Sequence, residues 1–451
     1  MNSAIFREYD IRGRFPEDLN EESVYRLGLS VGTYYRNRDA EKISIGRDCR
    51  LSSPDLNEVL VKGLTESGIT ILDVGMVPTP LLYFSIFHLE LDGGIQITGS
   101  HNPPEYNGFK ICLGKTTIHG DEIQKIREIY EKGEFQKGNG NMEETEVITP
   151  YLAYLKNNIF PGDIRRKVVI DAGNGVAGIV APDAYTEMGV EVERLFCEPD
   201  GRFPNHHPDP TIPENLKHLI SEVSIKSADL GIAFDGDADR IGVVDSEGNI
   251  IWGDQLMIIF SRDLLERSPG ANIIGEVKCS QVLYDDIQKH GGVPIMWKAG
   301  HSLIKSKMKE EGALLAGEMS GHLFFADRYF GYDDAIYAGA RLLEIITRKD
   351  KSVSALLSGI PKMVNTPEIR IDCPDDKKFR VVAELTEAFK KEYNVIDVDG
   401  ARVIFDGGWG LIRASNTQPV LVLRFEARDE ERLREIKDLF MERLEKSPLL
   451  R

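Results

Sequence analysis

Ser100 stands where a short apolar segment meets a stiff polar loop. Residues 93–97, GGIQI, predict a buried strand, and the loop that follows is TGSHNPPEYNG. Because Pro103 and Pro104 cannot continue regular structure, this loop presents the Ser100 hydroxyl with little conformational entropy left to lose. Lys110 supplies a cation nearby, so the segment is typical of a nucleophile with an electrostatic partner. A simple turn built from Gly, Asn and Pro is the alternative interpretation.

An alternating set of carboxylates follows a second apolar segment, at 230–234. The sequence AFDGDADR places an aspartate at every second position: Asp235, Asp237 and Asp239. Carboxylates this close repel one another unless a hard cation lies between them, which indicates a Mg²⁺ site. A calcium loop of the EF-hand kind is excluded, because Arg240 stands where that loop needs glycine and Ser246 where it needs glutamate. Three solvated aspartates in a turn are the alternative.

Two further segments carry groups suited to a sugar and to a phosphate. GEMSGH, at 317–322, combines two glycines with Glu318 and Ser320, which bind hydroxyls, and with His322, which can carry a proton. LIRASNTQP, at 411–419, offers a phosphate cradle of side-chain and N–H donors from Arg413, Ser415, Asn416 and Thr417. A Gly-rich surface turn and a polar turn between strands are the respective alternatives.

Several isolated residues have two interpretations each. Arg12, in FREYDIRG, suits a phosphate or phosphoserine contact and equally suits a structural ion pair. Glu276 and Lys278, in GEVKCS, suit a binding site or a plain salt bridge. His301, in KAGHSLIK, suits a binding site or a buried structural histidine.

A strand–helix–strand unit recurs along the chain and predicts how these segments are positioned. Its copies join KISIGRD to ITILDVG through a helix at 54–67, KVVIDAGNG to VEVERLF through 179–188, and NIIGEVK to VPIMWKAG through 280–290. The pattern is typical of a βαβ element in a mostly parallel sheet. Because sequence identity between the copies is low, chance recurrence is the alternative to three related α/β domains.

The length of 451 residues and the shifts in composition predict four domains. A polar, Glu-rich segment marks the first boundary, and we expect domains at 1–150, 151–252, 253–367 and 368–451. In the last domain, short strands at EIRID, ARVIFDG and VLVLRFEA alternate with helices at 379–393 and 430–445, which predicts an antiparallel α+β arrangement. The expected fold class is therefore α/β, with three related mixed α/β domains and a C-terminal α+β domain.

The overall composition excludes several classes of protein. A hydrophobic content of 41% and a charged content of 28% are typical of a soluble globular protein. The net charge of −18 argues against nucleic acid and against an acidic membrane surface as partners. We found neither a signal peptide nor an apolar run near the roughly 20 residues of a membrane span, so we expect a cytoplasmic location. Five scattered cysteines without a CxxC pair argue against a disulfide framework or a zinc site.

Together, the four chemical segments resemble the α-D-phosphohexomutase superfamily, of the phosphomannomutase/phosphoglucomutase type. TGSHNPPEYNGFKI resembles the family's active-site serine signature, DGDADR its metal loop, GEMSGH its sugar-recognition loop and LIRASNTQP its phosphate loop. The motifs occur in the family's order and span nearly the whole chain. The resemblance implies four domains around one central cleft, lined also by His101, Lys278 and His301, with Arg240 beside the metal.

The reaction that the resemblance implies is an intramolecular phosphoryl exchange. Phosphorylated Ser100 would donate its phosphoryl group to the free hydroxyl of a hexose 1- or 6-phosphate and recover the other phosphate from a hexose 1,6-bisphosphate. That bisphosphate would also prime the enzyme as an activator. Ser100, Asp235, Asp237 and Asp239 would hold Mg²⁺, Lys110 and Arg240 would stabilise the transferred group, and Lys110 and His322 would carry protons.

Three alternative functions follow from the same residues. Met319 favours a phosphomannomutase/phosphoglucomutase over a phosphoglucosamine mutase, in which we would expect glutamine at this position. A metal-dependent sugar phosphatase would leave the second phosphate loop unexplained, and a non-catalytic sugar-phosphate sensor would not need Ser100 and Lys110. The expected partners are small hexose phosphates, with the protein as a monomer or homo-oligomer, and the choice between mannose and glucose stays open. We also expect hinge motion near Pro367, because the bisphosphate must reorient.

Overall fold

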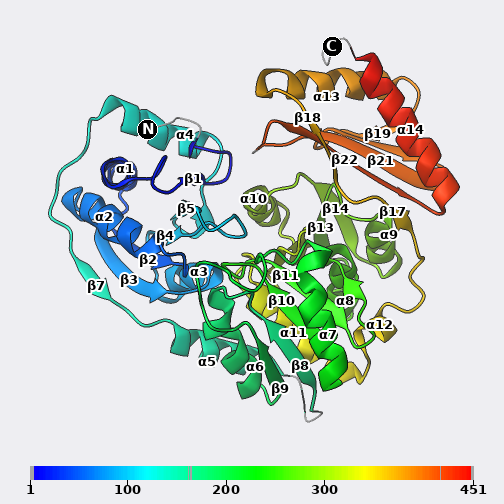
Figure 1. Cartoon of the computed structure of the whole chain (residues 1–451), viewed down its shortest axis with the longest axis horizontal. Coiled ribbons are helices and arrows are strands. Elements are labelled where there is room, and N and C mark those ends of the chain that lie inside the picture. Colours follow the sequence, from blue (N-terminus) through cyan, green and yellow to red (C-terminus); the bar gives the residue numbers. More distant parts are fainter. Residues whose placement is uncertain (1–4, 161, 163–164, 417, 448–451) are drawn as a thin grey trace.

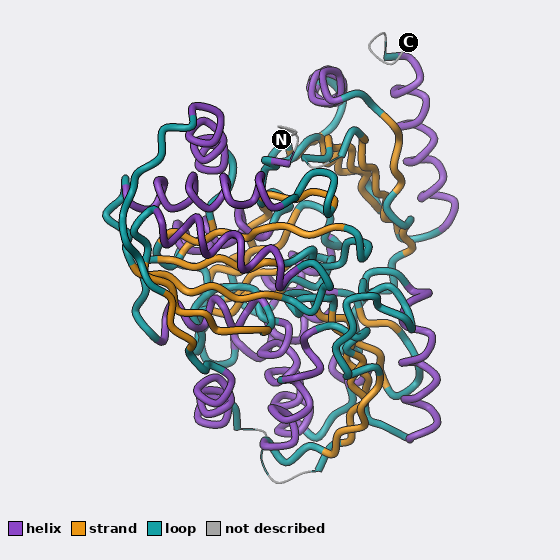
Figure 2. Tube along the Cα trace, turned by 60° about the vertical axis from the view of Figure 1, so that its left-hand side comes forward, coloured by secondary structure: helices purple, strands orange, loops and turns teal. Residues whose placement is uncertain are grey.

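The computed structural model describes residues 5–160, 162, 165–416 and 418–447, which form four sheets (Figure 1). Figure 2 shows helices on either side of the strands in the α/β part of the chain. Three of the sheets mix parallel and antiparallel strands, and the fourth is antiparallel. This agrees with the predicted fold class.

The first sheet carries the serine loop. Its strands β3, β2 and β4 are parallel, β5 joins β4 antiparallel, and β1, β6 and β7 extend the edges. Its strands are β1 Ile11–Arg14, β2 Lys42–Arg47, β3 Thr70–Met76, β4 Gly93–Ile97, β5 Tyr106–Leu113, β6 Thr116–Thr117 and β7 Met142–Glu144. Its helices are α1 Glu21–Arg36, α2 Ser53–Glu66, α3 Thr79–His88 and α4 Asp121–Lys132.

The second sheet repeats the order of the first. β9, β8 and β10 are parallel, β11 joins β10 antiparallel, and β12 follows at the edge. Its strands are β8 Lys167–Asp171, β9 Glu191–Leu195, β10 Leu230–Phe234, β11 Ile241–Asp245 and β12 Ile250–Ile251. The helices here are α5 Ile148–Asn158, α6 Ala181–Glu187 and α7 Lys217–Lys226.

The third sheet has the same order again. β14, β13 and β15 are parallel, and β16 joins β15 antiparallel. Its strands are β13 Asn272–Glu276, β14 Val293–Trp297, β15 Leu315–Gly317 and β16 Leu323–Phe325. The helices here are α8 Gly253–Leu265, α9 Gln281–Lys289, α10 His301–Glu311, α11 Ala335–Lys349 and α12 Val353–Leu356. The predicted repeat is therefore a repeat of sheet topology, and the three helices expected between its strands correspond to α2, α6 and α9.

The C-terminal sheet is antiparallel and packs on both faces. Its strands are β17 Val364–Asn365, β18 Ile369–Asp372, β19 Asn394–Ile396, β20 Ala401–Phe405, β21 Gly408–Ala414 and β22 Val420–Ala427. One face packs on α13 Asp375–Lys390 and α14 Glu430–Lys446, with Phe389 and Phe440 in the core between them (Figure 1). The other face places Trp409 and Leu411 against Val277, which follows β13.

The helix boundaries follow local capping chemistry. Asn20 caps α1: its side chain accepts the Ser23 N–H at 3.0 Å, and the Ser23 hydroxyl accepts the Asn20 N–H at 2.9 Å. α13 begins at Asp375, earlier than the predicted 379, because Pro374 occupies the N-cap, where a missing N–H costs nothing.

Candidate active site

Three of the predicted chemical segments leave the same position of the repeated sheet. The Ser100 loop follows β4, the Asp235 loop follows β10, and the Glu318 loop follows β15. Each loop joins the last parallel strand of its sheet to the antiparallel strand beside it. Because ligands of α/β sheets bind at the carboxyl ends of the parallel strands, this position favours a shared site.

One cavity of about 1060 Å³ brings these loops together with the β21–β22 turn. The cavity is lined by predicted site residues from all four domains: Arg12, Ser100, His101, Lys110, Asp239, Arg240, Lys278, His301, Glu318, Ser320, His322, Arg413, Ser415 and Asn416. Asp235 and Asp237 are fully buried next to this lining. Thr417 lies outside the described residues.

Ser100 has a constrained backbone and a directed hydroxyl. Its φ of +49° lies in the left-handed region, which costs on the order of 1 kcal/mol or more for a residue with a Cβ. The hydroxyl donates to Asp235 Oδ2 at 2.8 Å and lies 3.0 Å from His101 Nδ1. Gly236 permits this approach, since a Cβ there would lie 2.5 Å from the Ser100 carbonyl oxygen.

His101 contributes a neutral ring to this part of the cavity. Burial, with the nearby charges of Arg240 and Arg12, holds the pKa of His101 well below its usual value. The ring can therefore exchange a hydrogen bond with the Ser100 hydroxyl without adding charge.

The three aspartates form one buried cluster whose oxygens could hold a metal ion. One carboxylate oxygen from each of Asp235, Asp237 and Asp239 lies within 4.8 Å of the other two. Oδ1 of Asp237 and Oδ1 of Asp239 are buried and have no hydrogen-bond partner among the described residues. Burial and the charges of Asp239 and Asp237 raise the pKa of Asp235 well above its usual value. Buried oxygens without donors suit a hard divalent cation such as Mg²⁺.

Lys110 connects the serine sheet to the metal loop. It lies on β5, and its Nζ donates to Asp237 Oδ2 at 2.7 Å and to Asp239 Oδ2 at 2.5 Å. Burial alone lowers the pKa of Lys110, but the surrounding carboxylates outweigh burial and raise it. Lys110 is therefore a cation at neutral pH, beside the Ser100 hydroxyl's acceptor.

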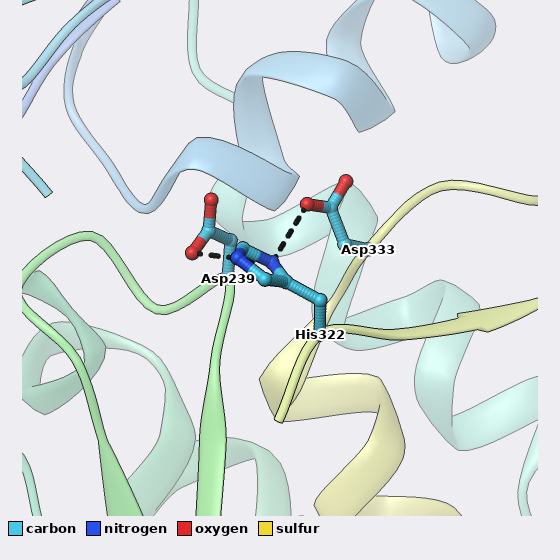
Figure 3. Close-up of side chains that lie close together, drawn as sticks. All are labelled: Asp239, His322 and Asp333. Carbon is cyan, nitrogen blue, oxygen red and sulfur yellow. Dashed lines mark ion pairs between the residues drawn. The ribbon is translucent and has the colours of Figure 1, made fainter. Parts of the chain in front are cut away.

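His322 lies between the carboxylates of Asp239 and Asp333 (Figure 3) and also contacts a guanidinium. Arg240 Nε donates to His322 Nε2 at 2.9 Å, while His322 Nδ1 lies 3.0 Å from Asp333 Oδ2 and 3.6 Å from Asp239 Oδ1. Because Nε2 accepts from Arg240, the proton of the neutral ring lies on Nδ1, toward Asp333. The pKa of Asp333 would be raised by burial, but Lys305 and His322 hold it well below its usual value.

The sugar-recognition segment is buried on one side and open to the cavity on the other. Glu318 accepts the Gly300 N–H at 2.7 Å, and half-buried Ser320 lines the cavity. The His301 ring stacks on His322 at 5.4 Å between centroids. Burial, with the charge of Lys305, keeps the pKa of His301 well below its usual value. The His301 side chain is 12% exposed and lines the cavity.

Lys278 and Arg12 each form an ion pair and also line the cavity. Lys278 Nζ donates to Glu368 Oε2 at 3.0 Å and lies 3.6 Å from Glu276 Oε1. Arg12 Nη2 donates to Asp10 Oδ2 at 2.5 Å, while its buried Nε has no partner among the described residues. Both cations line the cavity, so each ion pair orients a cation toward it.

The predicted phosphate loop faces the cavity from the C-terminal domain. Arg413 Nε donates to Asp399 Oδ2 at 2.9 Å, which orients the guanidinium. The Ser415 hydroxyl accepts the Gln418 N–H at 3.1 Å and closes the turn. Asn416 Nδ2 donates to the Tyr9 hydroxyl at 2.6 Å, so the loop contacts the N-terminal domain directly.

Sequence reasoning missed several residues in and beside this cavity. Tyr9 lies between Asn416 and the Ala299 carbonyl, to which its hydroxyl donates at 3.1 Å. Asp333 lies outside every motif, and Arg424 lines the cavity with Nε and Nη1 unpartnered among the described residues. The one available signal was the polar sequence of FREYDIRG, which contains Tyr9.

Comparison with known proteins identifies the family. Models of the phosphoglucomutase/phosphomannomutase family match along the chain: α/β/α domain I at residues 3–137, domain II at 149–248, domain III at 252–364 and the C-terminal domain at 368–443. The chain therefore belongs to the phosphoglucomutase/phosphomannomutase family.

Individual relatives agree over nearly the whole length. A phosphomannomutase/phosphoglucomutase of Pseudomonas aeruginosa is 49% identical over 98% of this chain and 96% of its own. A phosphoglucomutase of Neisseria gonorrhoeae is 46% identical over 99% and 98%. The crystal structure of a phosphoglucomutase/phosphomannomutase family protein from Burkholderia thailandensis, 43% identical, superposes with a TM-score of 0.93 over 98% of this chain and 97% of that one.

Proposed function

We propose that this chain is a mutase that interconverts hexose 1-phosphates and hexose 6-phosphates, with mannose, glucose or both as the sugar. One observation carries the proposal: the Ser100 hydroxyl lies 2.8 Å from Asp235, in a cavity that is also lined by the phosphate-loop residues Arg413 and Ser415. A reactive group and a separate anchor suit a substrate with a hydroxyl at one end and a phosphate at the other. The names of the relatives support the same reaction.

The transfer step uses Ser100 in its phosphorylated form. The bond between phosphorus and Ser100 Oγ breaks as a bond forms between phosphorus and the free hydroxyl oxygen of the sugar. Arg240 Nε leaves His322 Nε2 for the phosphoryl group, so that Nε2 takes the hydroxyl proton and passes it to the departing Ser100 Oγ. The bound hexose 1,6-bisphosphate then reorients and returns its other phosphoryl group to Ser100, while the proton goes back to the product oxygen. The same bisphosphate, supplied from outside, phosphorylates the unmodified enzyme and acts as its activator.

Binding and charge stabilisation fall to the other cavity residues. Lys110 and Arg240 stabilise the negative charge on the transferred phosphoryl group, because both are cations whose charges act on Asp235, the acceptor of the Ser100 hydroxyl. Glu318 and Ser320 orient the sugar hydroxyls. Arg413, Ser415, Asn416 and Thr417 form the cradle for the phosphate that is not transferred. The path between this cradle and Ser100 is lined by Arg12, His101, Lys278 and His301.

The aspartate cluster is the proposed Mg²⁺ site. Asp235, Asp237 and Asp239 hold the ion together with an oxygen on Ser100, and the two unpartnered buried oxygens of the cluster support this assignment. When bound, Mg²⁺ neutralises charge on the phosphoryl oxygens.

We also propose four domains, at 1–150, 151–252, 253–367 and 368–451. The protein is proposed to be cytoplasmic and to bind small molecules rather than nucleic acid. The sheets support the first two divisions, since β7 ends at Glu144 and β12 at Ile251. β17, Val364–Asn365, pairs with β22 of the C-terminal sheet, which favours a last division before 364. Among the described residues, no helix has the length and apolarity that crossing a membrane requires.

Intact-protein mass spectrometry tests the proposal. Wild type and Ser100→Ala are incubated with glucose 1,6-bisphosphate and Mg²⁺, and both are assayed on mannose 1-phosphate, glucose 1-phosphate and glucosamine 1-phosphate. One phosphate adduct on wild type only, with isomerisation of mannose or glucose 1-phosphate, is the expected result. Net release of phosphate would instead indicate a phosphatase, and neither adduct nor turnover would indicate a sensor.

A further inference from the structure

Arg50 supports the Ser100 loop from beneath, although no sequence motif contains it. It lies between β2 and α2, and its side chain is 1% exposed. One terminal nitrogen, Nη2, donates to the carbonyls of Ser100 at 2.7 Å and Asn102 at 2.6 Å. The other, Nη1, donates to the carbonyls of Pro103 at 2.6 Å and Tyr106 at 2.9 Å. A single guanidinium therefore holds four backbone carbonyls of the loop that carries the nucleophile.

Asp48 fixes both Arg50 and the start of the loop. Its Oδ2 accepts Arg50 Nε at 3.1 Å and the Gly99 N–H at 3.1 Å, and its Oδ1 accepts the Ser53 hydroxyl at 2.7 Å. Gly99 packs directly on the guanidinium, because a Cβ there would lie 2.4 Å from Arg50 Cζ. The loop is thus held at the Gly99 N–H by Asp48 and at four carbonyls by Arg50.

The third domain uses a related contact on its own functional loop. Glu276 is the last residue of β13, a position similar to that of Asp48 directly after β2. The Glu276 carboxylate accepts the Lys278 N–H at 3.2 Å and the Met319 N–H at 3.3 Å. In the first and third sheets, an acidic residue at the carboxyl end of the first parallel strand, β2 or β13, accepts an N–H from the loop that follows the third parallel strand, β4 or β15. The recurrence argues that this contact positions the functional loop, since the two sheets share little sequence.

We propose that Arg50, oriented by Asp48, is a positioning residue for phosphoryl transfer at Ser100. The inference rests on the proposed mutase function. Ser100 is held at a φ of +49°, a conformation that persists only when its surroundings enforce it. Without the four carbonyl contacts, Ser100 relaxes and its hydroxyl leaves the line toward Asp235. A displacement of about 1 Å is enough to slow a positioned reaction by roughly 100-fold. Lysine cannot replace Arg50, because it lacks the planar fork that reaches several acceptors at once.

The test compares Arg50→Lys with a matched control, Arg36→Lys, an arginine of α1 whose ion pair with Glu41 is partly exposed. The rate of Ser100 phosphorylation by glucose 1,6-bisphosphate is followed by rapid quench and intact-protein mass spectrometry, and kcat and KM are measured with glucose 1-phosphate. Arg50→Lys is expected to lower the phosphorylation rate and kcat by about 100-fold while KM changes less than about threefold, because the phosphate cradle is on another domain. Arg36→Lys is expected to match wild type.

A second pair of variants separates positioning from folding. Arg50→Gly leaves room for free guanidinium, and millimolar guanidinium is expected to restore phosphorylation in Arg50→Gly but not in Arg50→Lys. Asp48→Asn is expected to slow phosphorylation about tenfold. A wild-type phosphorylation rate in folded Arg50→Lys, or failure of guanidinium to restore Arg50→Gly that binds glucose 1-phosphate normally, would overturn the inference. Absence of an adduct on wild type would count against the mutase function itself.

Discussion

The Asp333 carboxylate lies 3.0 Å from Nδ1 of His322, and both side chains are at most 4% exposed. The same carboxylate accepts Lys305 Nζ at 3.0 Å through its other oxygen. A buried carboxylate on Nδ1 keeps the proton on that nitrogen and fixes the direction of the ring, which leaves Nε2 as the acceptor toward the cavity side. Asp333 is therefore expected to act on the reaction through His322.

Asp333→Asn should lower kcat by about 10- to 100-fold, because the amide can present its NH₂ to Nδ1 and favour the wrong tautomer. KM for glucose 1-phosphate should stay within about twofold, since Asp333 does not line the cavity. Steady-state kinetics measure both constants. Asp350→Asn, at an exposed carboxylate at the end of α11, is the control and should leave kcat unchanged. An unaltered kcat in folded Asp333→Asn would show that His322 needs no such orientation.

Every parallel strand of the repeated unit except β15 could be predicted from the sequence. Buried parallel strands are continuous apolar runs, and a glycine follows each helix of the repeat, at Gly68, Gly189 and Gly291. The antiparallel strand that completes each sheet was not predicted. β15 and β16 have three residues each and lie on either side of a functional loop, so their sequence has too few positions to establish a period.

The site could be predicted only where its residues are close together in the sequence. Asp235, Asp237 and Asp239 act within one loop, so their spacing alone indicated a metal site. Tyr9 instead acts through Ala299, 290 residues away in the chain, and nothing in its own neighbourhood indicates that contact. Arg50 was missed for a related reason, because its partners are backbone carbonyls, which every residue has.

Removal of divalent cations should lower the melting temperature and abolish turnover, and Mg²⁺ should restore both. The physical reason is that the buried aspartate cluster loses a counter-charge, with Asp237 Oδ1 and Asp239 Oδ1 left unpartnered. Mg²⁺ at 100 times its Kd is expected to stabilise the protein by about 2.7 kcal/mol. Differential scanning calorimetry with EDTA and with added Mg²⁺ measures the effect. Asp237→Asn should lose the Mg²⁺-dependent shift, and Asp183→Asn, at an exposed aspartate of the same domain, should keep it.

His206 should make the stability of the second domain depend on pH. Its Nε2 lies 3.0 Å from Asp171 Oδ2, and although burial lowers the pKa of His206, the hydrogen bond and charge of Asp171 outweigh burial and raise it. A raised folded-state pKa gives stability that is complete below the usual value near 6.5 and is lost as the pH rises through the folded-state pKa. The melting temperature of wild type should therefore exceed that of His206→Gln by more at pH 6 than at pH 8.5. An equal difference at both pH values would mean that the pair contributes no charge-dependent stability.

Tyr9 should help to close the cavity before substrate binds. Burial raises the pKa of Tyr9 to about 12, so its hydroxyl is protonated at neutral pH. It donates to the Ala299 carbonyl at 3.1 Å and accepts Asn416 Nδ2 at 2.6 Å, which ties the N-terminal domain to the third and C-terminal domains. Tyr9→Phe removes both hydrogen bonds. At roughly 0.5–1.5 kcal/mol for each bond, KM should rise by at least about 5-fold.

Small-angle scattering provides the independent measurement for Tyr9→Phe. The ligand-free variant should have a larger radius of gyration than wild type, because the C-terminal domain is released at the phosphate loop while its packing of Trp409 on Val277 stays intact. Tyr25→Phe is the matched control, since its hydroxyl bonds Glu66 within the N-terminal domain and should leave both the radius of gyration and KM unchanged. If Tyr9→Phe raises KM without changing the radius of gyration, the hydroxyl acts on the substrate itself and does not hold the domains together.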